Sequence, residues 1–89
     1  DDLSIIARAI AIVHGEFEMI HPFREGNGRL GRLIAALMAL QAGYPPPIFD
    51  IKEKIYYNAM KEVFANKNYD PLTKIIETVM ELGVKKARG

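Results

Sequence analysis

The chain has 89 residues, of which 49% are hydrophobic and 26% are charged. This length allows one domain or part of one, and this mixture excludes a disordered tail or a collagen-like chain. The 12 basic and 11 acidic residues leave a formal charge of +1, so no basic field favours nucleic acid as a partner. The absence of cysteine excludes a disulfide framework, a thiolate zinc site and a cysteine nucleophile.

Membrane and targeting signals do not stand out in the sequence. The longest apolar run, 33–40, is far shorter than the roughly 20 residues that a membrane span needs, and no signal peptide is visible. We therefore expect a cytoplasmic protein with no membrane partner. The first residue is Asp1 rather than Met, so we expect 1–89 to be a piece of a longer domain.

The first half of the chain predicts two helices. Apolar residues lie on almost every side of the stretch 3–20, a pattern typical of a helix that is buried centrally. Pro22 forces His21 out of the helical region, so this helix ends there. The stretch 27–41 is rich in alanine and is followed by Gly43, which predicts a second helix that ends just before this glycine.

The second half predicts two more helices after a proline-rich loop at 44–48. Asp50 followed by Glu53 resembles a capping box, so the third helix is expected at about 51–66. Asp70 followed by Pro71 predicts the start of a fourth, which would end near residue 82. The expected inward residues of these two helices are Ile55, Ala59, Met60, Val63, Phe64, Leu72, Ile75, Ile76, Val79 and Met80.

No segment is typical of a strand, so we expect an all-α protein with about four helices. Lys85, Lys86 and Arg88 form a short basic end after the last of them. The methionines at 19, 38, 60 and 80 are expected to fill the core. His14 lies mid-helix among apolar residues, and we interpret it as a structural histidine rather than a functional one.

The segment 21–32, which reads HPFREGNGRLGR, has the features of a phosphate site. Gly26, Asn27 and Gly28 open the second helix, where glycines let successive backbone N–H groups turn toward one point. The positive end of the helix dipole adds to this attraction for anions. Arg29 and Arg32 are three residues apart and share a helix face, so both can offer forked donors to phosphate oxygens.

Three further residues of the segment suggest a reaction at these phosphates. Glu25 precedes the glycines, and a carboxylate beside phosphates usually holds a divalent cation. A neutral imidazole at His21 can take a proton from a hydroxyl near pH 7. Phe23 alternates with both and is expected to point into the core. The combination indicates transfer of a phosphate-linked group to a hydroxyl.

The same segment resembles the signature of the Fic-domain family, His-x-Phe-x-(Asp/Glu)-Gly-Asn-Gly-Arg-x-x-Arg, at every fixed position. The resemblance implies that 1–89 is a single catalytic core, a Fic-type helical bundle whose motif loop leads into the second helix. It also implies transfer of AMP from ATP to a Ser, Thr or Tyr hydroxyl of a target protein. The further N-terminal helices and the β-hairpin flap of the family are not visible before Asp1.

The resemblance also implies a role for each motif residue. His21 would be the general base, Glu25 would hold Mg²⁺, and Phe23 would anchor the loop. The remaining residues would bind ATP: the phosphates at Gly26, Asn27, Gly28, Arg29 and Arg32, and the adenosine at Tyr56 or Tyr57. Gly28 also favours AMP transfer, because the kinase-like Doc branch has lysine there. Phe64 departs from the pattern, since many members have asparagine at this position.

Several alternatives remain open at this point. The chain is also compatible with a catalytically silent nucleotide-binding module, a toxin–antitoxin component, or transfer of another phosphate-linked group. An inhibitory helix or an antitoxin is a candidate partner, as is a second copy of the chain. Thr73 and Glu77 weakly match the inhibitory helix of many Fic proteins, whose glutamate pairs with the second arginine of the motif.

Overall fold

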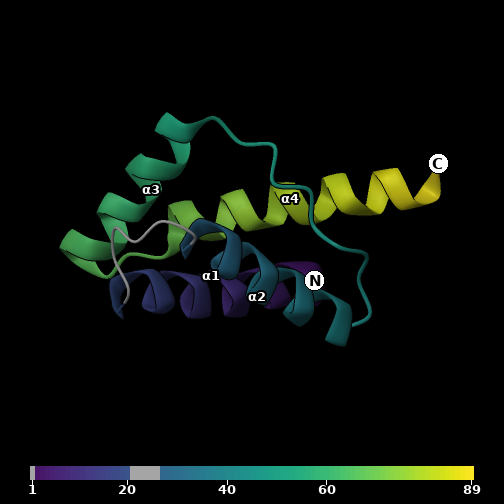
Figure 1. Ribbon diagram of the computed structural model, residues 1–89, viewed down its shortest axis with the longest axis horizontal. Helices are drawn as coiled ribbons and strands as arrows, with labels where there is room; N and C mark the ends of the chain where they lie inside the picture. Colours follow the sequence, from purple (N-terminus) through teal and green to yellow (C-terminus); the bar gives the residue numbers. More distant parts are fainter. Residues whose placement is uncertain (1, 21–26) are drawn as a thin grey trace.

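The computed structural model describes residues 2–20 and 27–89, with side chains after the gap described from Arg29 onward. These residues form four α-helices: α1 (Asp2–Ile20), α2 (Asn27–Gln41), α3 (Glu53–Asn66) and α4 (Asp70–Arg88) (Figure 1). Within this part of the chain there is no strand, which confirms the all-α prediction. No described helix combines the length and the apolar character that crossing a bilayer requires.

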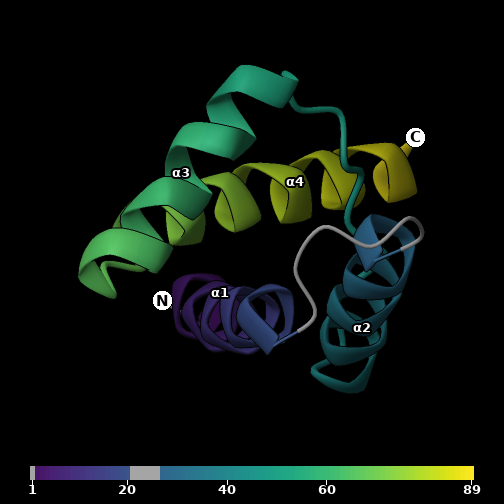
Figure 2. The same ribbon diagram turned by 60° about the vertical axis from the view of Figure 1, so that its left-hand side comes forward.

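Helix α1 is the element that connects the bundle. It lies beside α4, which runs in the opposite direction, and α2 packs on another side of α1 (Figures 1 and 2). Helix α3 packs on α4 and also touches α1. Because α1 contacts all the other helices, its side chains are placed to reach residues that come from both α2 and α3.

The core combines small and large apolar side chains. Five buried alanines from α1, α2 and α3 allow the helix backbones to approach closely: Ala7, Ala11, Ala35, Ala39 and Ala59. The inward face predicted for α4 is confirmed, since its five members are all buried. The methionines also behave as predicted, because Met60 and Met80 are buried and Met19 and Met38 pack against the core.

The predicted apolar faces of α1 and α3 are partly wrong. Helix α1 buries one side only, and Ile5 and Ile20 are 67% and 71% exposed. On α3, Ile55 and Phe64 are exposed although both belong to the predicted inward stripe. The three neighbours of α1 pack on part of its circumference, so periodicity alone overestimates burial in a chain this short. Helix α2 likewise exposes four leucines, Leu30, Leu33, Leu37 and Leu40.

Two predicted helix boundaries also need correction. Helix α3 begins at Glu53 after an extended Lys52, and no side chain caps it. Asp50 lies too far before the helix to form a capping box, and its backbone N–H donates to the carbonyl of Ile48 instead. Helix α4 continues to Arg88 rather than ending near residue 82. The basic residues therefore lie in its last turn, where positive charge interacts favourably with the helix dipole.

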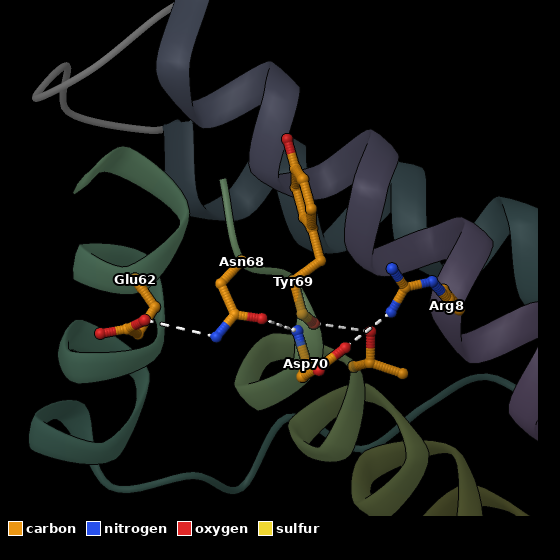
Figure 3. A network of polar contacts seen from close by, with 6 residues as sticks. Arg8, Glu62, Asn68, Tyr69 and Asp70 are labelled. Atoms are coloured by element: carbon orange, nitrogen blue, oxygen red, sulfur yellow. Dashed lines mark hydrogen bonds and ion pairs between the residues drawn. The ribbon is translucent and has the colours of Figure 1, made fainter. Parts of the chain in front are cut away.

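The turn between α3 and α4 is held by polar side chains (Figure 3). Lys67 ends α3 in the left-handed region at φ 53°. Asn68 then joins the two helices, because its Nδ2 donates to Glu62 Oε1 at 3.3 Å and its Oδ1 accepts from the Asp70 N–H at 3.1 Å. Arg8 of α1 pairs with Asp70 at 2.8 Å. This pair is exposed and contributes about 0–1 kcal/mol, so it orients α4 more than it stabilises it.

The connector between α2 and α3 lies directly on α4. The N–H of Ile48 donates to the carbonyl of Val79 at 3.0 Å. Further along α4, a Cβ placed on Gly83 would lie 2.2 Å from the carbonyl oxygen of Pro46. No real Cβ tolerates this distance from a backbone atom, so the connector can pack here only because residue 83 is glycine.

This contact predicts the effect of Gly83→Ala. In an open helix position, alanine would stabilise the protein by up to about 1 kcal/mol relative to glycine. Here the new methyl group displaces the connector, and we expect a net loss of about 1–3 kcal/mol, as for other overpacked sites. Urea denaturation measures the change. Glu81→Ala, an exposed change on the same helix, is the control and should stay within about 0.5 kcal/mol. A stabilised Gly83→Ala protein would show that the connector does not pack on α4.

Candidate functional site

The sequence motif spans the gap and the start of α2. His21, Phe23, Glu25 and Gly26 lie outside the described residues, so their predicted roles stay predictions. Asn27 and Gly28 form the first two residues of α2, which begins at the residue that the sequence predicted. The first backbone N–H groups of a helix lack partners within the helix, and they are available there to an anion.

Arg29 and Arg32 follow on the first turns of α2, and both are exposed. Arg32 lines a cavity of about 240 Å³ together with His14 of α1 and Tyr56 of α3. All four helices contribute to this cavity, since Ile75 and Ile76 of α4 also line it. The structure thus brings together Arg32 and Tyr56, two predicted site residues that are far apart in the sequence. Arg29 lies on the same helix closer to its start, and it does not line this cavity.

A second, larger cavity adjoins α3. It has a volume of about 740 Å³, within the roughly 300–1,000 Å³ of small-molecule pockets. Its lining combines aromatic and apolar side chains with charged ones: Tyr56, Tyr57, Met60, Phe64, Glu18, Glu53, Lys54 and Lys61. Apolar faces beside charged groups suit a flat ring that carries polar substituents.

The two predicted tyrosines have different positions in this cavity. Tyr56 is half-buried and lines both cavities, whereas Tyr57 is 61% exposed and lies at the rim. The Nζ of Lys61 lies 5.7 Å from the centroid of the Tyr57 ring. Phe64 also lines the larger cavity, so the position where the sequence departs from the family pattern belongs to the candidate site.

His14 is buried, as expected for a histidine packed within the bundle. Its Nε2 lies 2.7 Å from the Oη of Tyr56, and the two rings meet edge to face at 76°. Burial lowers the pKa of His14 below its ordinary value of 6.5, although a hydrogen bond with the backbone of Gly31 acts to raise this pKa. The ring is therefore neutral at pH 7. Burial also raises the pKa of Tyr56, and the charge of Glu18 adds to the rise.

Gly31, which lies between the two motif arginines, has a packing role that was not predicted from the sequence. A Cβ on Gly31 would lie 2.9 Å from both Glu18 Oε1 and His14 Cε1. Glycine therefore permits the close approach of α2 to α1 at this point. A lone glycine inside an alanine-rich helix was the available signal, because such a residue usually has a packing reason.

The weak match to an inhibitory helix falls on α4. Thr73 Oγ1 donates to the carbonyl of Tyr69 at 2.7 Å within the same helix. Glu77 Oε2 accepts from Ser4 Oγ at 2.6 Å, which links α4 to the start of α1. Both side chains thus make contacts that stabilise the bundle. Pairing of Glu77 with Arg32 stays a prediction.

The described residues contain no group of three or more His, Asp or Glu side chains arranged to hold a metal ion. A Mg²⁺ ion bound together with substrate phosphates usually takes only one or two protein carboxylates. Such an ion therefore does not require a larger cluster. Glu25, the residue predicted to hold it, lies outside the described part of the chain.

The fold and the site define a helical bundle with a motif-bearing helix next to an aromatic cavity. The family model described as the Fic/DOC family matches residues 2–39, which include α1 and most of α2. Among curated proteins, protein adenylyltransferase fic-1 of Caenorhabditis elegans is 29% identical over 79 residues, covering 89% of this chain and 16% of the relative. Protein adenylyltransferase Fic of Culex quinquefasciatus is 32% identical over 74 residues, covering 83% and 15%.

The segment 2–39, which contains the motif, is thus similar to the Fic/DOC family, and the relatives similar to the chain are named protein adenylyltransferases. Protein adenylyltransferase Fic of Drosophila grimshawi is 40% identical over a shorter stretch of 52 residues, covering 57% of this chain and 11% of the relative. The chain spans about one sixth of the length of the first relatives, at 16% and 15%. No solved structure matches the chain.

Proposed function

We propose that the protein transfers AMP from ATP to a Ser, Thr or Tyr hydroxyl of a target protein. The observation that carries this proposal is the shared cavity of Arg32, from the phosphate-binding motif, and Tyr56, from the predicted adenosine side. A nucleotide can span these two residues with its phosphates at the start of α2 and its base toward α3. The names of the relatives, protein adenylyltransferases, support the same reaction.

In this reaction His21 accepts the proton of the target hydroxyl. The hydroxyl oxygen forms a bond to the α-phosphorus of ATP, the bond from this phosphorus to the bridging oxygen breaks, and pyrophosphate leaves. Gly26, Asn27 and Gly28 bind the phosphates through backbone N–H groups at the positive end of α2. Arg29 and Arg32 add forked donors to the β- and γ-phosphates, and their positive charge favours the departing pyrophosphate.

The remaining site residues position the substrates. Glu25 is the residue that would hold Mg²⁺, a cation that neutralises phosphate charge when it is bound. Tyr56 and Tyr57 form the walls around the adenosine, and Phe23 anchors the loop that carries His21. The proposed partners are a target protein and, for regulation, an inhibitory helix, an antitoxin or a second copy of the chain.

Labelling with ATP tests the reaction. The protein is incubated with Mg²⁺ and ATP labelled in parallel at the α- or the γ-phosphate, and His21→Ala is treated in the same way. We expect self-labelling, or labelling of an added target protein, from α-labelled ATP only. The His21→Ala protein should stay unlabelled.

Other labelling patterns would overturn the proposal. Label from the γ-position alone would make the protein a kinase and contradict the argument from Gly28. Label from neither position, together with measurable ATP binding, would favour the catalytically silent nucleotide-binding module. Stronger labelling from another nucleotide or from a phosphate-linked alcohol would keep the mechanism but change the transferred group.

The position of Phe64 predicts how the adenosine is held. Phe64 lines the larger cavity and is 42% exposed, so its side chain can be exchanged without emptying the core. Phe64→Asn adds an amide that can hydrogen-bond the adenosine, and a net hydrogen bond contributes about 0.5–1.5 kcal/mol. We therefore expect ATP binding to tighten by about 2–10-fold, measured by calorimetry.

Phe64→Leu is the matched control, because it removes the aromatic ring without adding a hydrogen-bonding group. Its ATP affinity should stay equal to that of the wild type or fall. Equal affinities of the asparagine and leucine variants would show that residue 64 does not face the base.

A further inference from the structure

His14 is the residue outside the motif that contacts both halves of the candidate site. Its Nε2 lies 2.7 Å from Tyr56 Oη on α3, and its ring packs against Gly31 on α2. The residue lines the smaller cavity but is only 4% exposed, so it offers a nucleotide little surface for direct contact. The influence of His14 on the reaction is therefore expected mainly through the residues that it touches.

The bond to Tyr56 fixes a side chain that lines both cavities. The hydroxyl of tyrosine both donates and accepts, so this bond persists whichever ring nitrogen of His14 carries the proton. Within the described part of the chain, Nδ1 has no hydrogen-bond partner. The contact with Tyr56 and the interaction with the backbone of Gly31 are therefore the polar interactions of the His14 ring within the described residues, and the contact with Tyr56 also holds the phenol.

The surroundings of His14 keep this contact specific. Three charged groups lie around it: Glu18 of the same helix, Arg32 of α2 and Glu53 of α3. The residues that face it from α4 are apolar, Ile75 and Ile76. Arg32 lies close enough for its charge to help lower the pKa of His14. The guanidinium of Arg32 is itself exposed.

We propose that His14 is a positioning residue for ATP binding: through its hydrogen bond it holds the phenol of Tyr56 at the cavity that Arg32 shares. This inference rests on the proposed function, because it assigns Tyr56 and Arg32 to one nucleotide. Loss of the His14 hydrogen bond leaves the chemistry at His21 intact but lets the wall of the cavity move. The expected defect is therefore in KM for ATP and not in kcat.

Four variants test this inference in labelling kinetics. His14→Leu and Tyr56→Phe each remove one partner of the bond, and we expect each to raise KM for ATP by about 5–20-fold with kcat changed less than about 3-fold. The double variant should resemble the single ones, because one bond can be lost only once. His14→Gln keeps a hydrogen-bonding group and should recover most of the wild-type KM.

A control separates this role from stability alone. Val79→Ala creates a cavity in the buried face of α4 and should lower the melting temperature while KM stays within about 2-fold. Additive KM effects in the double variant would overturn the proposal. So would a His14→Gln protein as impaired as His14→Leu, or a His14→Leu protein that loses kcat instead.

Two readouts that need no turnover distinguish failure of this inference from failure of the proposed function. His14 and His21 are the two histidines of the chain, so His21→Ala assigns the His14 ring signals in NMR spectra. Tyr56→Phe should shift these signals, and unchanged signals would refute the contact. If the wild type binds ATP without transferring AMP, the proposed function fails while dissociation constants of the four variants still decide the role of His14. No ATP binding by the wild type would overturn both.

Discussion

Replacing His21 by alanine is expected to abolish transfer of AMP while ATP binding stays within about 2-fold of the wild type. Proton transfer by a positioned side chain contributes roughly 10²–10⁴-fold to a rate, so the labelled product should fall below detection in most assays. The affinity should persist because, in the proposed function, the start of α2 and the arginines bind the phosphates and the imidazole does not. Labelling rates and ATP calorimetry on the same preparation measure the two quantities.

The helicity of the His21→Ala protein provides the control, since the substitution lies between α1 and α2 and outside both. Circular dichroism should match that of the wild type. Transfer that continues at a comparable rate in this protein would show that another group accepts the proton. A parallel loss of ATP affinity would instead assign His21 to binding.

Replacing Arg32 by alanine is expected to weaken ATP far more than AMP. The guanidinium lies at the cavity next to Tyr56, and the motif places it on the terminal phosphates, which AMP lacks. A hydrogen bond to a charged group contributes about 1.5–3 kcal/mol, so the affinity for ATP should fall by roughly 10–100-fold. The affinity for AMP should change by less than about 3-fold. Calorimetric titration with each nucleotide gives the comparison.

Arg8→Ala is the matched control for charge. Arg8 is an exposed arginine on α1 that pairs with Asp70 at the turn between α3 and α4 (Figure 3), and it lines neither cavity. Its removal lowers the net charge by the same amount and should leave both affinities unchanged. If Arg32→Ala lowers the affinities for ATP and for AMP equally, Arg32 does not bind the terminal phosphates.

The sequence predicted the helices well where single residues define their ends. Gly43 and Pro71 end and begin helices for steric reasons that act locally, so the end of α2 and the start of α4 were predicted correctly. The prediction of a capping box at Asp50 was wrong because a favourable spacing of two residues does not ensure that the helix starts between them. The predicted end of α4 was wrong because its basic residues form a favourable last turn, so the helix continues through them.

Burial and long-range contacts were less predictable. Phe64 follows the helical period of α3 yet lies exposed at a cavity, because periodicity shows which residues share a face and not what covers that face. His14 was interpreted as a structural histidine, but its partner Tyr56 is 42 residues away, and nothing in either local sequence indicates the pairing. The motif allowed a prediction of the chemistry because its residues are adjacent in the chain, and this prediction is the one that the labelling experiment tests.

The packing of α2 has a geometrical consequence for the arginines that it carries. Helix α2 has 15 residues and is about 22 Å long. Gly31 packs closely against His14 and Glu18 of α1, and Ala35 and Ala39 are buried further along the same helix. Small residues therefore hold the axis of α2 at three successive turns. A larger side chain at any of these three positions would displace Arg29 and Arg32 together with the helix that carries them.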